Sequence, residues 1–583
     1  MRSQFAQRLR KSSISAVPPP RSSSDYSERL ARSAASILYR SPLPSQADLP
    51  VYVLNAAAFP DARETDYDAL LPYVLARLPS EEELLTGTEY EVVFFAGGGD
   101  DGVTSQRRAR PGWGWFIQAY YVLSRAMRKR LQRLYVVHER SWVRILVEMF
   151  STIVSPKFRR KIVHVSTLSS LALHVALEDL LIPSSAYLYD RRLSDDIYAP
   201  YASGRRAFGA KNPLPKSSSG RSRLPRVLRE TSTFLLMEPN VRTEGLFRVP
   251  PHHRLREVLR EAYDRGQKYI VWKDNGVTLP VPDYDGAEPT DAIVREVDPS
   301  DAYGVHLAAG LIKNWYTKLR QPVFPQSCYR ELKRLHGDID EEPSREKLIE
   351  LVSLESEWSI LPRLSREILI RHLLPLLSRV ASYEDFNKMS PENLSICFAP
   401  ALVCGQDQLE DAKMSSIIRR LLAAAVEEWP NGLRNACGVD EETFDEDLRP
   451  PADMGEYEDP LEDRSPERPH EEASAGAFEQ QSGIILQDNE APRAPPPLPP
   501  RRPNAPAAGA IESDTSSIGQ AQRRKPAPPL SVAPPRYSVV IGAGPSDEVT
   551  ESPGSYSPAV PVADGFRPSG RSSVDKESPP GPE

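Results

Sequence analysis

The chain has 583 residues, a formal net charge of −7 and 57 prolines, which are concentrated toward the C-terminus. This length predicts more than one domain, and the negative charge excludes nucleic-acid binding driven by the charge of the whole chain. No apolar run is long enough to span a bilayer.

The cysteines indicate free thiols in a reducing compartment. They are Cys328, Cys397, Cys404 and Cys437. No two of them form a CxxC pair, and their spacing differs from that of a zinc ligand set. We therefore expect a cytoplasmic protein without a metal site or a cofactor. Peripheral association with membranes is a further expectation.

Residues 1–47 are predicted to form a disordered lead. They are rich in Arg and Ser, and no acid precedes Asp25. This composition also resembles a mitochondrial presequence. Because Pro18 to Pro20 break any helix, we favour the disordered tail over that alternative.

Strands and helices alternate over 48–197, which predicts an α/β domain with a largely parallel sheet. The expected strands are VYVLNAAAF (51–59), EYEVVFFAG (89–97), LYVVH (134–138) and KIVHV (161–165). Apolar residues at helical spacing predict helices over 116–127, 142–153 and 167–181.

The segment 206–430 is predicted to be an all-α domain. A first helix carries an apolar stripe over 224–235, and Asp298-Pro299 is predicted to start a second one with a stripe over 308–319. A buried helix over 365–380 is expected to kink at Pro375. Ser390-Pro391-Glu392 opens a further helix, 415–428 closes the domain, and 269–297 is predicted to be a long loop.

The tail, 435–583, is acidic at first and then rich in Pro, Ser, Ala and Arg. It lacks apolar periodicity and cannot bury enough apolar surface to offset the entropy of ordering. We therefore expect it to be disordered.

The segment Thr243-Glu244-Gly245-Leu246-Phe247-Arg248 is the most informative stretch. Its glycine permits a sharp turn, and two large apolar side chains can fix that turn to a core. The arginine is then held out on a rigid loop. A planar, permanently charged guanidinium is well suited to neutralise charge that develops on a transferring phosphoryl group.

Three segments in order resemble the RhoGAP family. The first comprises FG (208–209), RLPRVLRETSTFLL (223–236) and TEGLFRVP (243–250). The second is HLAAGLIK (306–313), ending in QP (321–322), and the third is NKMSPENLSICFAP (387–400). The resemblance implies an all-helical bundle that accelerates GTP hydrolysis by Rho-type small GTPases in signal transduction.

The resemblance also implies roles for single residues. Arg248 matches the arginine finger, which is supplied in trans, so the protein is expected to be a GTPase activator rather than an enzyme with its own substrate site. Lys313 matches a lysine that supports the finger loop and the GTPase contact, and Asn393 matches an asparagine at the GTPase interface. Thr317 stands where the family usually has an arginine. Its neighbour Lys318 is an imperfect substitute, because adjacent helical residues point about 100° apart.

The upstream region resembles the BCH branch of the CRAL-TRIO lipid-binding fold. The matching stretch runs from LQRLYVVHERSWVRILVEMF to KIVHVSTLSSL (131–171) and ends in LLIP (180–183). The resemblance implies contacts with a second small GTPase, another BCH module or a lipid. The polar, proline-broken stretch before Val51 cannot supply the helical subdomain of lipid carriers, which disfavours lipid exchange.

Other motifs favour structural interpretations. GGGDDG (97–102) satisfies GxGxxG, but its two aspartates would repel a pyrophosphate, so we expect a flexible loop. His252 and His253 are adjacent and make a poor metal pair. For the basic cluster we favour a solvated face over contact with an anionic membrane or an acidic partner. Its members are Arg125, Arg128, Lys129, Arg130 and Arg133.

The tail contains RAPPPLPPRRP (493–503), a predicted ligand for SH3 domains. Arg493, Pro496 and Pro499 fit RxxPxxP, and Pro496, Pro499 and Arg501 fit PxxPxR. A further candidate is formed by Arg523, Pro526 and Pro529. Polyproline II segments are preformed ligands for aromatic grooves, and the arginine selects the orientation.

Taken together, these observations predict a GTPase-activating protein for Rho-family GTPases. Two alternatives stay open at this point. One is a GTPase-binding scaffold with weak activity, prompted by Thr317. The other is a lipid-binding adaptor in which the first domain dominates.

Overall fold

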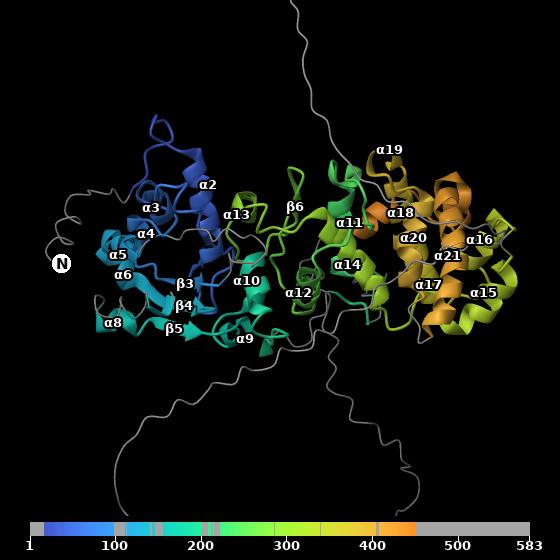
Figure 1. Ribbon diagram of the computed structural model, residues 1–583, viewed down its shortest axis with the longest axis horizontal. Coiled ribbons are helices and arrows are strands. Elements are labelled where there is room, and N and C mark those ends of the chain that lie inside the picture. Colours follow the sequence, from blue (N-terminus) through green and yellow to red (C-terminus); the bar gives the residue numbers. More distant parts are fainter. Residues whose placement is uncertain are drawn as a thin grey trace, which may run out of the picture. The chain divides into compact units, whose positions relative to one another are not determined.

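The computed structural model describes residues 17–450, apart from 98–110, 112, 140–142, 146–147, 149–154, 201–207, 212–213, 215–221, 285, 339 and 404–406. An α/β region comes first along the chain and a helical region follows (Figure 1). No helix in the described part is long and apolar enough to cross a membrane.

The α/β region is built on a mixed sheet with the strand order β1-β2-β3-β4-β5. The strands are β1 (Leu38–Arg40), β2 (Val51–Asn55), β3 (Tyr90–Phe95), β4 (Leu131–Val137) and β5 (Ile162–Val165). β2 to β5 are parallel, and β1 is antiparallel to β2. All six residues of β3 are buried, as expected of a central parallel strand covered on both faces.

The predicted disordered lead over 1–47 is wrong for its second half. Helix α2 (Glu28–Ile37) begins at the cap Ser27 and leads directly into β1. Ala34, Ala35 and Ile37 are buried along one side of α2. The Arg- and Ser-rich composition of the lead concealed this short apolar stripe, because composition averages over both sides of a helix.

Side-chain caps shorten several predicted elements. The strand expected over 51–59 ends at Asn55, whose side chain accepts from Ala57 N and starts the 3₁₀ turn η1 (Ala56–Ala58). The helix expected over 116–127 is two helices, because Ser124 caps the second. The helix expected over 167–181 reduces to two single turns, α9 (Leu168–Leu171) and η2 (Leu177–Asp179).

The helices of this region are α3 (Tyr67–Leu75), α4 (Glu81–Leu85), α5 (Trp113–Val122), α6 (Arg125–Arg130), α8 (Pro156–Arg159), α9 (Leu168–Leu171), η2 (Leu177–Asp179) and α10 (Ser184–Asp190). The helix predicted over 142–153 lies mostly outside the described residues.

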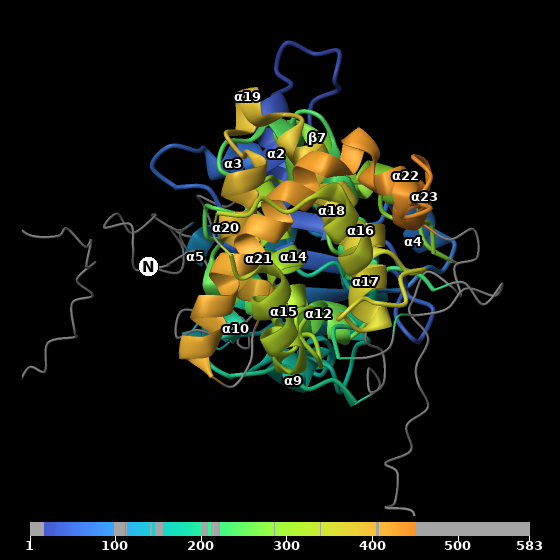
Figure 2. The same ribbon diagram turned by 90° about the vertical axis from the view of Figure 1, so that its right-hand side faces the viewer.

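The helical region is a bundle (Figure 2), and its buried apolar side chains form one large core. Its helices are α11 (Arg226–Leu236), η4 (Asn240–Arg242), α12 (His253–Asp264), α13 (Thr290–Glu296), α14 (Val305–Thr317), η5 (Gln326–Cys328), α15 (Tyr329–His336), α16 (Arg345–Val352), α17 (Arg363–Ile368), η6 (Leu369–Leu373), α18 (Leu374–Ala381), α19 (Glu384–Asn387), α20 (Pro391–Leu402), α21 (Gln408–Glu428), η7 (Trp429–Leu433), α22 (Arg434–Ala436) and α23 (Thr443–Leu448). The hairpin β6 (Lys273–Asp274) and β7 (Val277–Thr278) lies within the segment predicted to be a loop.

A carboxylate from a distant residue sets the start of α14. The predicted start at Asp298-Pro299 is wrong, because Asp298 accepts from Ser300 within a turn. Asp274 Oδ2 accepts from Val305 N at 2.9 Å and caps the helix there. The start of α14 is therefore set by Asp274 on the β6–β7 hairpin and not by the local sequence Asp298-Pro299.

The expected kink near Pro375 takes the form of a widened turn. The π-helical turn η6 (Leu369–Leu373) precedes α18, so Pro375 falls in the first turn of a new helix, where proline is tolerated. Within η6, His372 lies between Ser232 Oγ at 2.9 Å and Tyr316 Oη at 2.6 Å. Burial lowers the pKa of His372 to about 3, so this link is neutral at physiological pH.

The first part of the acidic tail is folded, which corrects the predicted disorder from residue 435. Phe444 and Leu448 of α23 are buried in the helical core. Arg371 bonds both carboxylate oxygens of Asp447, at 2.6 and 2.8 Å. The stretch 443–448 is ordered because its apolar side chains are buried and one of its acids pairs with Arg371 from a distant turn of the bundle.

The segment 267–303 of the helical region packs on one face of the sheet. Tyr269, Val271 and Val294 share a buried apolar cluster with Val53 and Phe95. The α/β region and the helical region therefore share part of a core.

Polar contacts accompany this shared core. Gln267 Nε2 donates to the carbonyls of Leu177 and Leu180, at 2.8 and 2.6 Å. Lys268 Nζ pairs with Asp179 Oδ1 at 2.7 Å. Satisfying these groups within the interface avoids the cost of burying unpaired polar atoms.

Asp301 is an acidic group whose titration this packing changes. Its carboxylate accepts from Asn55 Nδ2 at 3.2 Å and from Ser185 Oγ at 3.5 Å. Burial, and secondarily the charge of Asp298, raise the pKa of Asp301 to about 6. The folded chain therefore holds a proton here that the unfolded chain releases near pH 4.

The first prediction concerns Asp301→Asn. The contribution of Asp301 to stability is present below about pH 4 and is lost as pH rises to about 6. The amide retains an acceptor oxygen without a charge, so we expect the variant to gain up to about 3 kcal/mol at pH 7 and to lose this part of the pH dependence. Urea unfolding between pH 4.5 and 7.5 measures both effects. The exposed Asp195→Asn is the control, and a variant no more stable than wild type at pH 7 would contradict the expectation.

Candidate functional site

The loop that carries Arg248 leaves helix α11 through the 3₁₀ turn η4 and is fixed at Gly245. Gly245 has φ +74, and its N–H donates to the Asn387 carbonyl at 2.9 Å. A Cβ at Gly245 would lie 3.0 Å from Val249 Cγ2. Both the positive φ and the limited space require glycine here.

Phe247 fixes the next turn of the chain. It has φ +63, which is uncommon for a residue with a side chain. Its ring is buried and lies 4.8 Å from the ring of Phe398 in an edge-on contact. Leu246 is also fully buried, so both apolar residues of the motif anchor the loop in the core, as the sequence predicted.

Arg248 points away from this core. Its side chain is 58% exposed, and Glu244 Oε1 lies 3.7 Å from its Nη2. An exposed pair at this distance contributes little, so a partner protein can replace Glu244 at small cost. The guanidinium is therefore presented to solvent from a backbone that is fixed on both sides.

Lys313 contacts the same loop from helix α14. Its Nζ donates to the Phe247 carbonyl at 3.1 Å. The helix can approach because Gly310 has no side chain: a Cβ there would lie 2.3 Å from Pro251 Cγ. The structure thus brings Lys313 to the residue that precedes Arg248.

Asn387 contacts the loop of Arg248, although the sequence assigned it no role. Besides accepting from Gly245 N, it donates from Nδ2 to the Val241 and Val380 carbonyls at 3.0 and 2.9 Å. It is fully buried. Its place at the start of the third motif was the available signal, but nothing local indicated a contact with a loop some 140 residues earlier.

Asn393 and Lys318 lie at helix ends. Asn393 Nδ2 donates to the Lys388 carbonyl at 3.1 Å, and the side chain is exposed near the start of α20. Lys318 is exposed at the end of α14, where Thr317 Oγ1 donates to the Asn314 carbonyl at 2.8 Å. Five residues correspond to about 140° around a helix, so Lys318 is displaced from the face that carries Lys313.

Exposed apolar side chains lie next in sequence to three residues of this site. Val249, Phe386 and Ile396 are 41%, 54% and 47% exposed, next to Arg248, Asn387 and Cys397 respectively. Burial raises the pKa of the Cys397 thiol, and the nearby charges of Lys313 and Arg248 partly oppose this shift. Cations and exposed apolar groups from three separate segments thus converge, which is typical of a surface that docks a protein.

Several motifs from the sequence are accounted for structurally. His252 Nδ1 accepts from Leu255 N at 3.2 Å and caps α12, and the described residues contain no group of three or more His, Cys, Asp or Glu placed to hold a metal ion. Of GGGDDG only Gly97 is described; a Cβ there would collide with the Tyr189 ring at 2.3 Å. The predicted SH3 ligands, including Arg493, Pro496, Pro499 and Arg501, lie outside the described residues.

The basic cluster is partly committed to internal contacts. Arg130 Nε donates to the Leu84 carbonyl at 3.2 Å, and Arg128 lies over the Tyr120 ring at 5.0 Å. Arg125, Lys129 and Arg133 are exposed. Arg128 and Arg130 thus make contacts within the domain, whereas the side chains of Arg125, Lys129 and Arg133 are open to solvent.

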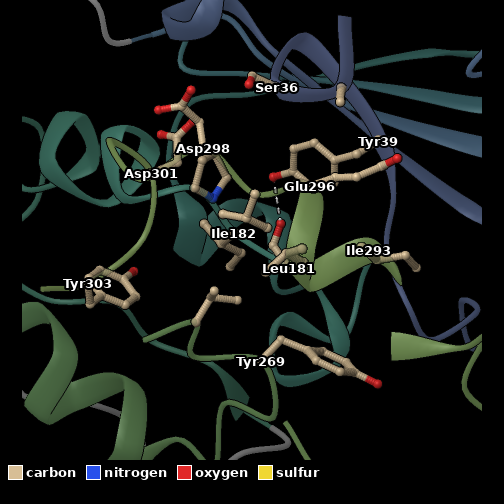
Figure 3. Close-up of a pocket in the computed structure, with 14 residues that line it drawn as sticks. Ser36, Tyr39, Leu181, Ile182, Tyr269, Ile293, Glu296, Asp298, Asp301 and Tyr303 are labelled. Atoms are coloured by element: carbon tan, nitrogen blue, oxygen red, sulfur yellow. Dashed lines mark hydrogen bonds between the residues drawn. The ribbon is translucent and has the colours of Figure 1, made fainter. Parts of the chain in front are cut away.

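A small cavity lies between the sheet and the segment 269–303 (Figure 3). Its walls include Tyr39, Ile182, Tyr269 and Tyr303, and Tyr39 Oη donates to the Leu181 carbonyl at 2.9 Å. Its volume is about 20 Å³, which is room for about one water molecule. This cavity is too small for an acyl chain.

Comparison with known proteins matches a family model to each of the two regions. The model of the divergent CRAL/TRIO domain matches residues 48–192, and the model of the RhoGAP domain matches residues 225–407. Human Rho GTPase-activating protein 1 is 26% identical over 61% of this chain and 73% of its own length. Protein prune homolog 2 of Xenopus tropicalis is 29% identical over 25% of this chain and 44% of its own length.

Among solved structures, human Rho GTPase activating protein 15 is similar, with 18% identity over 34% of this chain and 81% of that one and a TM-score of 0.25. The two domain models match in the order that the sequence motifs predicted. The chain therefore carries a divergent CRAL/TRIO domain followed by a RhoGAP domain.

Proposed function

We propose that this protein accelerates GTP hydrolysis by Rho-family small GTPases and that Arg248 is the residue it inserts into the partner's nucleotide site. One observation carries the proposal: Arg248 is exposed, while the residue before it is buried and anchored. A guanidinium held in this way needs little further ordering when it enters another protein's site.

The chemistry follows from the charge and shape of the guanidinium. As the γ-phosphoryl group of GTP leaves, negative charge develops on the transferring group and on the leaving oxygen. Arg248 donates N–H bonds to these oxygens and stabilises the charge more in the transition state than in bound GTP. The GTPase provides the nucleotide and its metal ion, so this chain needs no cofactor of its own.

Lys313 is proposed to act through the finger loop. Its ammonium group holds the Phe247 carbonyl, which fixes the peptide that leads to Arg248. Asn393 and the exposed Lys318 are proposed to contact the GTPase surface. Because Thr317 gives the interface a hydroxyl where the family usually has a cation, we expect the contact with the GTPase to depend less on salt at this point.

An adaptor that carries lipid in the first domain gains no support from the cavity beside the segment 269–303, because its volume of about 20 Å³ is too small for an acyl chain. A role of the segment Arg493 to Arg501 as an SH3 ligand is proposed from its sequence alone. That role concerns localisation and partner choice and is independent of the GTPase reaction.

The second prediction is that Arg248→Ala abolishes most of the stimulation. We expect the maximal rate of phosphate release from GTP-loaded Rho-type GTPases to fall by about 10³-fold or more, as for other fingers supplied in trans. Arg248→Lys keeps the charge without the planar fork and should recover little. The measurement is single-turnover phosphate release at saturating activator, across a panel of Rho-type GTPases.

The control is Arg330→Ala, an arginine on α15 that is 91% exposed, which should leave the rate unchanged. Equal rates for wild type and Arg248→Ala would disprove the activator function. Wild-type protein that binds the GTP-bound partner without stimulating it would instead identify a scaffold.

The third prediction concerns Lys313→Met, which preserves much of the side-chain volume and removes the donor. We expect the maximal rate to fall by about tenfold or more, because the carbonyl that precedes Arg248 loses its anchor. Lys333→Met on α15 is the matched control. Wild-type rates for Lys313→Met would show that the bond at 3.1 Å does not position the finger.

A further inference from the structure

The tip of the β6–β7 hairpin contacts the segment that leads into the finger loop. Asn275 Nδ2 donates to Asn240 Oδ1 at 3.0 Å and to Thr243 Oγ1 at 3.1 Å. Asn240 belongs to the turn η4, and Thr243 is the first residue of the segment 243–248 that carries Arg248. The hairpin lies outside all three sequence motifs that indicated the family.

The direction of these bonds is fixed by the neighbours of Asn275. Asn240 is fully buried and donates from Nδ2 to the Phe234 carbonyl at 2.9 Å, so its Oδ1 is turned toward the hairpin as an acceptor. Asn275 must therefore present its amide nitrogen. Without that donor, a buried oxygen of Asn240 would lose its partner, which is costly.

The backbone of the hairpin suits an asparagine at this position. Asn275 has φ +48 and Gly276 has φ +82, the pair of left-handed residues that a two-residue hairpin turn needs. Asparagine tolerates this conformation better than most residues with a side chain. The tip is thus a tight turn that holds its amide in place.

The base of the hairpin is rigid. Lys273 N donates to the Tyr303 carbonyl at 3.0 Å, and Lys273 Nζ donates to the Arg295 and Val297 carbonyls at the end of α13, both at 2.8 Å. Trp272 is fully buried, and Asp274 caps α14. Because its base is fixed, the tip of the hairpin can hold the loop in place instead of moving with it.

We propose that Asn275 is a positioning residue for Arg248, acting through Asn240 and Thr243. The contacts of Asn387 and Lys313 hold the loop at Val241, Gly245 and Phe247. Asn275 adds a contact at the start of the loop from a third element, the β6–β7 hairpin, and so fixes the position at which the loop begins its turn. This inference rests on the proposed role of Arg248.

The test uses two variants that both keep the turn. Asn275→Asp retains the shape but faces Asn240 Oδ1 with an acceptor, and Asn275→Gly removes the side chain while favouring positive φ. For both we expect the maximal rate of stimulated phosphate release to fall by about tenfold, while the Kd for the GTP-bound GTPase changes less than about twofold. Full-length protein is used throughout.

Two comparisons separate positioning from a structural role. Asn431→Asp, which removes a donor that bonds the Glu427 carbonyl at 2.9 Å, is the matched control and should leave both quantities unchanged. In an Arg248→Ala background, Asn275→Asp should cause no further loss of rate, because the finger it positions is absent.

The outcomes distinguish the two proposals. If Arg248→Ala lowers the rate but both Asn275 variants stimulate like wild type, the positioning role is wrong and the finger stands. If the Asn275 variants weaken binding and rate equally, Asn275 supports the surface rather than the finger, which also overturns the inference. If Arg248→Ala has no effect, the proposed function itself fails.

Discussion

The burial of Phe247 in a left-handed backbone conformation is the constraint on which the site depends. A residue with a Cβ loses about 1 to 2 kcal/mol in this conformation. Burying a phenylalanine side chain contributes about 1.5 to 3 kcal/mol, and the contact with Phe398 adds to it. Burial therefore offsets the strain, and the reversal of the chain at Phe247 turns Arg248 outward.

Fixing one residue is useful only if the loop on both sides is also held. Asn387 holds the loop from the buried start of the third motif, and Lys313 holds it from α14. Lys313 and Asn387 lie about 65 and 140 positions from the loop, respectively, so the order is supplied by the bundle and not by the loop itself. The entropy of placing the cation is thus lost during folding and does not have to be lost when a GTPase binds.

The CRAL/TRIO domain and the RhoGAP domain are joined by more than a linker. Tyr269 and Val271 precede the β6–β7 hairpin directly and are buried with residues of the sheet. The same stretch continues to Asp274, which caps α14, and to Asn275 at the tip. Val271, which is buried with the first domain, therefore lies only four residues before Asn275, which contacts the segment leading into the finger loop.

The sequence determined the parts that depend on local pattern. Buried strands, the helical stripe of α11 and the cap Ser390 follow from side-chain periodicity and short-range bonds, which any segment carries with it. The motif around Arg248 was also found from sequence, because a glycine, two apolar residues and an arginine in order have a physical meaning without their surroundings.

Only the tertiary structure decided what depends on residues far apart in the chain. Asp274 moved the start of α14 to Val305, and Arg371 ordered an acidic stretch that composition marked as disordered. The roles of Asn387 and Asn275 belong to the same class, because a single amide has no pattern of its own. Its effect is set by the carbonyls and side chains that folding places within about 3 Å of it.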